Sequence, residues 1–226
     1  MDYKEILDKI DAVLEGNPHL DELAERTDSA FKILISTILS ARTRDSNTRK
    51  ATKDLFKKFN TPKKIADAPQ DEIEELIRPA GFYRVKAARI KEVSQILLND
   101  YEGETPKTFN QLNALPGVGP KTANCVLVYA FNIPAIPVDT HVHRISNRLG
   151  WVKTKNPEQT QKALEKKLPK DLWTRINRIF VKFGQQICLP NNPKHEECPV
   201  EDFCPKDFSM EQAKKKKRKK KKQKKS

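Results

Sequence analysis

The sequence predicts an all-helical (all-α) protein. Over most of its 226 residues, apolar side chains recur at the three- and four-residue spacing of one helix face. Alternating runs of Val, Ile, Thr and Tyr between turn signals, the pattern of a half-buried strand, are nearly absent. A chain of this length can bury a sizeable core, either as one larger domain or as two small ones.

The first expected helices are one at the N-terminus and one in the core. The N-terminal helix covers residues 3–14 and has Ile6, Ile10 and Val13 at helical spacing. Ser29 can cap the second helix, because its hydroxyl can accept a hydrogen bond from a first-turn amide. The apolar residues of this second helix form the continuous stripe of a central core helix. They are Phe31, Leu34, Ile35, Ile38 and Leu39.

Four more helices are expected before residue 100, joined by short polar connections. They cover residues 46–59, 61–68, 70–77 and 83–99. In the last of them, Ile90, Val93 and Leu97 share one side, and we expect this side to face the core.

The stretch LPGVGPKTANC, residues 115–125, predicts a helix-hairpin-helix. A short helix over residues 110–114 leads into a turn, and Pro120 suits the first position of a second helix that runs to about Ala130. Gly117 and Gly119 permit positive φ and let a partner approach the backbone. The first amides of the second helix have no acceptor within it, so together with the helix dipole they favour an anion such as a nucleic-acid phosphate. The alternative is an ordinary helix-helix turn.

The chemistry of this hairpin depends on Lys121, in the first turn of the second helix, and on Asp139, in the later segment PVDTHV. Burial beside a positive helix end disfavours the ammonium form of a lysine, whereas nearby phosphates favour it. A neutral amine can form a Schiff base with an aldehyde-like sugar carbon. Asp139 can take a proton or stabilise positive charge on the sugar. Alternatively, Lys121 only touches phosphate and Asp139 only caps a helix that starts at Thr140.

The C-terminal part combines an amphipathic helix with a cysteine-rich loop. The helix covers residues 172–187 and leads directly into the loop. Cys188, Cys198 and Cys204 fall within seventeen residues. In a chain without a secretion signal, this crowding indicates a metal site rather than a disulfide framework. The fourth cysteine, Cys125, lies on the apolar side of the hairpin helix and is expected to be a core thiol.

The last residues, 209–226, are expected to form a disordered tail. Residues 211–226 hold eleven Lys or Arg and one Glu, which is +10 of the formal +14 and leaves +4 for residues 1–210. Such a block of like charges repels itself and cannot bury an apolar face. The tail would add salt-sensitive affinity for DNA or RNA. The alternatives are a solubilising appendage and a localisation signal.

The sequence has no apolar run near the roughly 20 residues that a bilayer requires, and no visible signal peptide. We therefore expect no membrane partner. The expected location is the cytoplasm, in association with the nucleoid, or the nucleus of a eukaryote.

Several segments together resemble the endonuclease III family of DNA glycosylases and AP lyases. LPGVGPKTA and VDTHVHR, residues 115–123 and 138–144, resemble the hairpin of the family and the segment after it. LISTILSARTRD, residues 34–45, resembles the early core helix, and GFYRVKAARI, residues 81–90, resembles the loop and helix before the hairpin. The cysteine loop lies where the family keeps an iron-sulfur cluster. The resemblance covers about residues 5–205.

The resemblance implies a two-lobed helix-hairpin-helix DNA glycosylase fold with DNA across the cleft between the lobes. Residues 22–134 would form a six-helix lobe that contains the hairpin at about 110–131. Residues 1–21 and 135–208 would form the second lobe, with the metal loop at 188–204.

The resemblance also implies a bifunctional repair enzyme. Lys121 corresponds to the nucleophilic lysine of the family and Asp139 to its essential aspartate. The lysine would attack the anomeric carbon of a flipped nucleotide, the base would depart, and the Schiff base would permit β-elimination 3′ to the lesion. The expected DNA contacts near them are Gly117, Val118, Gly119 and His141.

Two residues depart from the family pattern at the expected DNA surface. Arg42 stands where the family usually has a glutamine that fills the gap left by the extruded base. A guanidinium can also fill that gap and can pair with guanine, or it can merely contact phosphate. Phe82 stands at a wedge position that is usually leucine, and it can stack into the duplex or pack in the core.

The third departure lies in the metal loop. The family spacing of four cysteines is x6, x2, x5, and this chain keeps the spacing with His195 in place of the second cysteine. Three thiolates and an imidazole can hold a 4Fe-4S cluster, which the resemblance favours, or a structural zinc ion. A degraded site without metal is the third possibility.

The expected substrate is double-stranded DNA with damaged or missing bases, and oxidised pyrimidines are the expected lesions. The protein is expected to act as a monomer. Two other functions fit the sequence: a glycosylase for thymine or uracil mispaired with guanine, and a DNA-binding module without catalysis. The pairing of Lys121 with Asp139 counts against the second.

Overall fold

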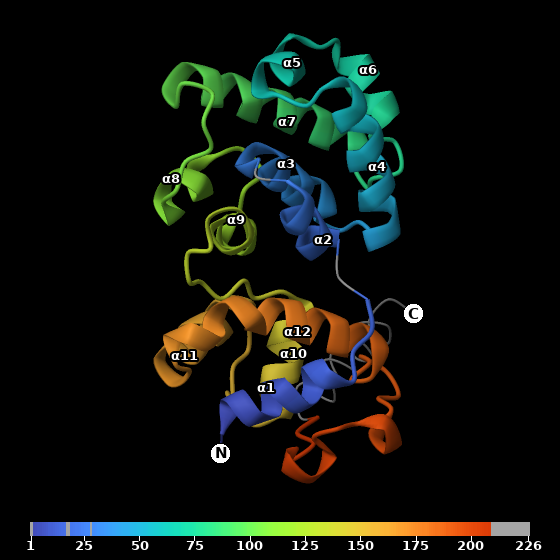
Figure 1. Cartoon of the computed structure of the whole chain (residues 1–226), viewed down its shortest axis with the longest axis vertical. Helices are drawn as coiled ribbons and strands as arrows, with labels where there is room; N and C mark the ends of the chain where they lie inside the picture. The colour runs from blue at the N-terminus through green and yellow to red at the C-terminus, as the bar shows by residue number, and fades with distance from the viewer. Residues whose placement is uncertain (1, 17–18, 28, 209–226) are drawn as a thin grey trace, which may run out of the picture. The chain divides into compact units, whose positions relative to one another are not determined.

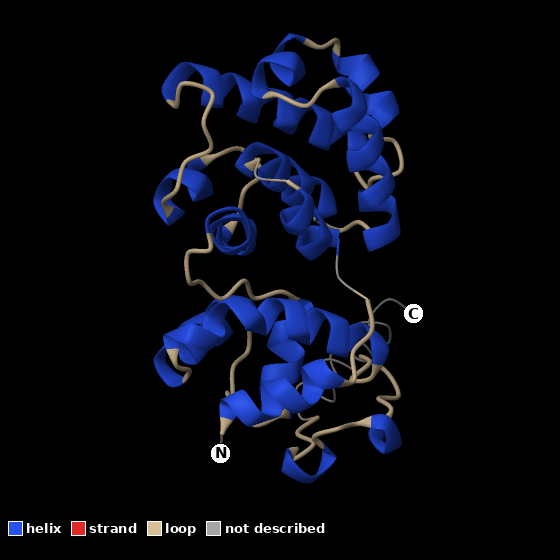
Figure 2. Cartoon of the chain, in the orientation of Figure 1, coloured by secondary structure: helices blue, strands red, loops and turns tan. Residues whose placement is uncertain are grey.

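The computed structural model describes residues 2–16, 19–27 and 29–208. The described chain is helical, and no strand occurs within it (Figure 2). The prediction of an all-helical fold is therefore confirmed. The expected lysine-rich tail, residues 209–226, lies outside the described residues. None of the helices in the described chain has the length and apolar composition needed to cross a bilayer.

The helices fall into two compact units, which are described separately below. Unit 1 combines Met1–Glu15 with Val138–Ser226, and unit 2 is Gly16–Pro137. In unit 2 the helices follow one another along the chain (Figure 1). They are α2 (His19–Arg26), α3 (Ala30–Ser40), α4 (Asp45–Lys58), α5 (Pro62–Asp67), α6 (Gln70–Leu76), α7 (Tyr83–Asp100), α8 (Phe109–Ala114) and α9 (Pro120–Phe131).

The centre of unit 2 is α3, as its sequence pattern predicts. Ser29 is its N-cap, and the Ser29 side chain accepts a hydrogen bond from the Lys32 amide at 3.4 Å. All five residues of the predicted apolar stripe are buried. Ile33, Ser36 and Thr37 are buried as well, because α2, α4, α7 and α9 all pack around this helix. A Leu34→Ala change would therefore cost about 2–5 kcal/mol, the usual cost of a large cavity in a closed core.

Unit 1 is built from the N-terminal helix and the C-terminal helices. The elements are α1 (Tyr3–Ala12), α10 (Thr140–Arg148), α11 (Pro157–Lys167), η1 (Lys170–Leu172), α12 (Trp173–Gln186), η2 (His195–Glu197) and η3 (Glu201–Phe203). Trp151 is among the most completely buried side chains, and its ring lies 5.1 Å from that of Tyr3 and 5.3 Å from that of Phe180. Segments from both ends of the chain therefore share one core.

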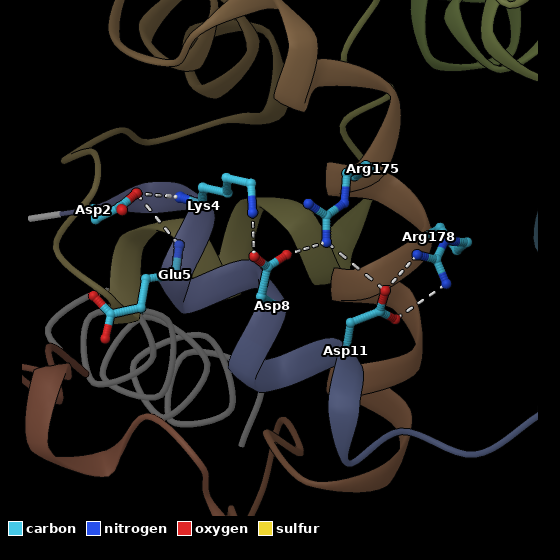
Figure 3. Close-up of polar contacts among 7 residues, drawn as sticks. All are labelled: Asp2, Lys4, Glu5, Asp8, Asp11, Arg175 and Arg178. Carbon is cyan, nitrogen blue, oxygen red and sulfur yellow. Dashed lines mark hydrogen bonds and ion pairs between the residues drawn. The ribbon is translucent and has the colours of Figure 1, made fainter.

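Ion pairs also join α1 to α12 in unit 1 (Figure 3). Arg178 donates two hydrogen bonds to Asp11, at 3.1 and 2.6 Å, and Arg175 donates one to Asp8 at 2.7 Å. The paired groups are 167 residues apart in the sequence. These contacts attach the first helix of the chain to one of its last.

Three details of the fold differ from the sequence prediction. The first helix ends at Ala12, because Val13 leaves the helical conformation as the C-cap, and its side chain is exposed rather than in the apolar stripe. Two helices, α2 and α11, lie in stretches where no helix was expected. The start signal of α11 is present in the sequence: Asn156 precedes Pro157 and its side chain accepts a hydrogen bond from the Gln159 amide at 2.9 Å.

Candidate active site and metal centre

The hairpin between α8 and α9 has a turn fixed by the chain itself. The Val118 amide donates to the Leu115 carbonyl at 3.0 Å, with Pro116 and Gly117 between them. Gly117 has a φ of 76°, and proline followed by a glycine with positive φ is the combination of a type II turn. Leu115 and Val118 are both buried in the unit 2 core. The hairpin is therefore anchored on its inner side and exposes its glycines on the other.

The two glycines of the hairpin serve different purposes. Gly117 adopts the expected positive φ, whereas Gly119, the N-cap of α9, has a φ of −96° that any residue can adopt. Apart from its two chain neighbours, a Cβ at Gly119 would meet no atom of the described residues within 4 Å. Internal sterics therefore do not require glycine at position 119, and its bare backbone leaves the start of α9 open to an external partner.

Lys121 lies in the first turn of α9, where the sequence places it. Pro120 is the first helical residue, and Gly119 provides no side-chain cap. The next residues of the helix are buried, and Cys125 is the buried core thiol that the sequence predicts. The half-exposed Lys121 therefore projects from a rigid base at the positive end of a helix, beside the hairpin.

Asp139 is the N-cap of α10, so its predicted capping role is confirmed. Its Oδ1 accepts hydrogen bonds from the amides of His141 and Val142, each at 2.8 Å. Both cap bonds end on the same oxygen, and a carboxylate has a second oxygen with its own acceptor sites. Capping therefore fixes the orientation of Asp139 without using its full capacity for proton transfer.

His141 packs closely against α12 within unit 1. Its Nδ1 lies 3.2 Å from the Arg144 guanidinium, and a Cβ at Gly184 would lie 2.3 Å from the same nitrogen. Burial lowers the pKa of His141, the nearby Asp139 carboxylate opposes that shift, and Arg144 adds to it. The structure thus gives His141 a packing role, and the DNA contact expected for it stays a prediction.

Arg42 and Phe82 lie on two adjoining loops of unit 2. The Arg42 guanidinium is 5.9 Å from the centre of the Phe82 ring. Both residues have a positive φ, 53° and 58°, a conformation that costs a non-glycine residue on the order of 1–3 kcal/mol. Phe82 is 63% exposed, so the alternative that it packs in the core is wrong. Two exposed side chains are thus held together in strained backbone conformations.

A buried lysine that was not among the residues predicted from the sequence holds these two loops. Lys86, on α7, is buried and donates to both the Arg42 loop and the helix before it. A signal was available in the sequence, because Lys86 falls on the same helical face as Ile90, Val93 and Leu97. A lysine on an apolar face requires a buried partner.

The four predicted metal ligands line one cavity of unit 1. Cys188 follows α12, His195 begins η2, and Cys198 and Cys204 are the C-caps of η2 and η3. The structure describes all four cysteines of the chain, and none forms a disulfide. The His195 ring also makes an edge contact with the ring of Phe208, at 6.1 Å between centres.

The surroundings of the sulfur atoms fit a bound cationic or iron-sulfur group. Burial raises the pKa of Cys198 and Cys204, and the neighbouring Cys188 raises both further. Thiolates brought together in this way are stabilised by metal. Arg148, only 2% exposed, donates to the Cys188 sulfur at 3.3 Å. Hydrogen bonds to ligand sulfurs are a common feature of iron-sulfur sites.

The zinc alternative can be compared with the side chains that the structure describes. Within the described part of the chain, no three His, Cys, Asp or Glu side chains form a group that could hold one metal ion. Zinc needs four ligands within about 2.0–2.3 Å of one point, so the zinc alternative has no support.

Comparisons with known proteins agree with the geometry. The family profile of the HhH-GPD superfamily base excision DNA repair proteins matches residues 35–170. The chain is 55% identical over 174 residues to Endonuclease III of Thermotoga maritima, a match that covers 77% of this chain and 82% of that protein. Similar proteins from plants and vertebrates are longer, and the chain spans 48–63% of their length.

Two solved structures illustrate the similarity of this fold to those of known proteins. A trapped Endonuclease III-DNA covalent intermediate, an estranged-adenine complex, matches with a TM-score of 0.78 and 34% identity, over 90% of this chain and 94% of that one. A thermostable thymine-DNA glycosylase matches with a TM-score of 0.79 and 27% identity, over 92% of this chain and 94% of that one.

Proposed function

Because the chain belongs to the HhH-GPD superfamily and, within it, to the endonuclease III family, we propose that Lys121 and Asp139 are its catalytic residues. The protein is a DNA-binding base-excision-repair enzyme, a DNA glycosylase with AP lyase activity. The observation that carries the residue assignment is the position of Lys121, a half-exposed amine in the first turn of the helix that follows the hairpin.

The proposed reaction starts with a nucleotide flipped out of the duplex, which costs least at a damaged base. The neutral Lys121 amine attacks C1′ of the deoxyribose, and the N-glycosidic bond breaks with its electron pair leaving on the base, which takes up a proton. The amine loses its proton and the sugar ring opens, giving a Schiff base between Nζ and C1′. Asp139 accepts the proton or stabilises the positive charge on the sugar.

The second half of the reaction cleaves the strand. Loss of a proton from C2′ of the Schiff base expels the 3′ phosphate oxygen, so the C3′–O bond breaks by β-elimination. Water then releases the unsaturated sugar from Nζ and regenerates the lysine. This sequence requires no external oxidant or reductant. A lysine at position 121 therefore accounts for both glycosylase and lyase activity in one site.

The hairpin and the two adjoining loops are the proposed DNA contacts. Backbone amides near Gly117, Val118 and Gly119 would receive a phosphate at the positive end of α9. Phe82 would enter the base stack as a wedge, and Arg42 would fill the gap left by the flipped base. A guanidinium there can pair with guanine, which gives a preference for lesions opposite guanine.

The cavity of the C-terminal loop is the proposed site of a 4Fe-4S cluster. Endonuclease III enzymes generally carry one. Cys188, Cys198 and Cys204 would supply three thiolates and His195 an imidazole. When bound, the cluster would cross-link residues that are otherwise held by short 3-10 helices. A His195→Ala change should release iron and sulfide from the purified protein, and a His195→Cys change should retain them at a lower reduction potential, since imidazole ligands raise it.

The proposed substrates are oxidised pyrimidines in double-stranded DNA. The protein would act as a monomer, at the nucleoid in the cytoplasm or in the nucleus of a eukaryote. The similarity to a thymine-DNA glycosylase favours one second candidate, a mismatch glycosylase. The test compares duplexes that carry thymine glycol, an abasic site or a guanine-thymine mismatch. Cleavage of the first two supports the proposed lesion class. Base removal from the mismatch alone would transfer the assignment to the second candidate.

A further inference from the structure

The loops that carry Arg42 and Phe82 touch each other through their backbones. A Cβ at Gly81 would lie 2.8 Å from the Arg42 carbonyl oxygen, a distance that real Cβ atoms essentially never show. The Gly81 amide also donates to the Thr43 hydroxyl at 3.1 Å. Gly81, the residue just before Phe82, is therefore positioned directly against Arg42 and Thr43.

The side chain of Lys86 bonds the loop that carries Arg42. Its Nζ donates three hydrogen bonds of 2.7 Å each, to the carbonyls of Leu39 and Ala41 and to the hydroxyl of Thr43. Lys86 is only 4% exposed. All three N–H groups of the ammonium thus have an acceptor, which is the condition for burying a lysine. We refer to Lys86, Thr43 and the backbone groups they bond as the Lys86 clamp.

The positive charge of Lys86 lies at the C-terminus of α3, where it stabilises the negative end of the helix dipole. Leu39 and Ala41 lie at the C-terminus of α3, whose last carbonyls have no donor within the helix and carry the negative end of its dipole. Burial lowers the pKa of Lys86 to about 8, and the nearby Arg89 adds to that effect. At neutral pH the ammonium therefore persists and fills all three contacts.

The hydroxyl of Thr43 completes the network by binding three partners. Its hydroxyl accepts from Lys86 and from the Gly81 amide, and it donates to the Ala41 carbonyl at 3.3 Å. The Thr43 amide donates to the Ser40 carbonyl at 3.1 Å. Hydrogen bonds thus hold the residues before and after Arg42, which are Ala41 and Thr43. The side chain of Arg42 itself stays exposed.

We propose that Lys86 is a positioning residue for the recognition of damaged DNA. By bonding Leu39, Ala41 and Thr43, it holds the backbones of Arg42 and Phe82 in their strained conformations. In these conformations the Arg42 side chain can fill the gap in the duplex and the Phe82 side chain can act as the wedge. A methionine would fill the same space as the lysine but could donate no hydrogen bond. The inference rests on the DNA contacts proposed for Arg42 and Phe82.

The structure provides a matched control on the same helix. Lys91, also on α7, donates to the carbonyl of Ala68, the C-cap of α5, and not to a residue of the loop that carries Arg42. Lys91→Met removes the same kind of bond between a lysine and a carbonyl. If lysine-carbonyl bonds on α7 only stabilise the fold, Lys91→Met and Lys86→Met will change activity alike.

The test is a double-mutant cycle on full-length, cluster-loaded protein. Single-turnover removal of thymine glycol is measured for Lys86→Met in the natural background and in an Arg42→Ala, Phe82→Ala background. We expect a loss of about 10- to 100-fold in the first, as for other small misplacements of positioned groups, and almost none in the second. An equal loss in both backgrounds, or no loss in the first, overturns the inference.

A second readout separates positioning from loss of folded protein. The ratio of rates for a lesion opposite guanine and opposite adenine does not depend on the active fraction. Lys86→Met should shift this ratio in the same direction as Arg42→Ala, and Lys91→Met should leave it unchanged. An unchanged ratio in Lys86→Met, in a protein where Arg42→Ala does shift it, contradicts the clamp.

Two further outcomes remain informative. If Lys86→Met does not fold, Thr43→Val removes only the shared hydroxyl and should give the same shift in the ratio, so an unshifted ratio overturns the inference. If the Arg42→Ala, Phe82→Ala protein removes thymine glycol at the natural rate, the proposed DNA contacts are wrong and the inference is overturned with them. The catalytic assignment of Lys121 would stand in that case, because it is tested separately.

Discussion

Asp139 combines a structural and a chemical role that a pair of substitutions can separate. Its Oδ1 accepts from two amides at 2.8 Å, and asparagine has an equivalent carbonyl oxygen that caps helices as well as aspartate does. Asp139→Asn should therefore keep the cap and lose only the carboxylate. Asp139→Ala should lose both, at a cost of about 1 kcal/mol for the cap. For a chain of this size, such a loss lowers the melting temperature by about 2–4 °C.

The catalytic effect of the same two changes should be much larger and nearly equal. A positioned acid-base group typically contributes a factor of about 100 to 10,000. Both variants should therefore lose at least about 100-fold in the single-turnover rate on thymine glycol, while only Asp139→Ala melts earlier in differential scanning calorimetry. Near-natural activity in Asp139→Asn would refute the chemical role of the carboxylate. Equal melting shifts in the two variants would refute the reasoning about the cap.

Three other consequences can be measured directly. Burial lowers the pKa of His19 and His141 below the ordinary 6.5, so below that pH the unfolded chain binds more protons than the folded protein. The free energy of unfolding should therefore fall as the pH drops below about 6.5, and urea unfolding at pH 7.5 and 5.5 checks the sign. Arg178→Met removes the bidentate ion pair with Asp11, in which both side chains are about a quarter exposed. The free energy of unfolding, measured by urea unfolding, should fall by no more than about 1 kcal/mol. Gly119→Ala adds a methyl group that, apart from the two chain neighbours, meets none of the residues that the structure describes, so the melting temperature should be unchanged while DNA binding weakens by about tenfold in a fluorescence titration; unchanged affinity would exclude a close DNA approach there.

Features that depend on neighbouring residues were predictable from the sequence. The apolar stripe of α3, the proline at the start of α9 and the cap at Asp139 are all local patterns, and each is found where the pattern predicts. The end of α1 was less predictable. Val13 continues the apolar spacing, yet the chain leaves the helix at this residue, and periodicity alone does not report where a helix stops.

The junction of Arg42 and Phe82 was not predictable, because it depends on contacts between distant segments. Lys86 bonds groups 43 to 47 residues earlier in the chain, and Gly81 is required by the Arg42 carbonyl rather than by its own turn. The positive φ of Arg42 likewise has no local sequence signal. Here the fold imposes a strained conformation that the residue type would not choose.

For the metal loop, the sequence predicted the set of ligands but not the metal that they would hold. Its spacing identified Cys188, His195, Cys198 and Cys204 as a set, and the structure brings all four to one cavity. The choice between zinc and a cluster could not follow from spacing, because both accept three thiolates and an imidazole. The described side chains add only that no three His, Cys, Asp or Glu among them form a group that could hold one metal ion.

The central claim, that the Lys121 amine forms the covalent link to DNA, is tested most directly by borohydride reduction during the reaction. The natural protein, incubated with a duplex that contains thymine glycol or an abasic site, should give one protein-DNA adduct, and digestion should locate the modification on Lys121. Lys121→Ala should give no adduct while it still binds the duplex. An adduct of undiminished yield in Lys121→Ala, or a modification mapped to another residue, would contradict the account.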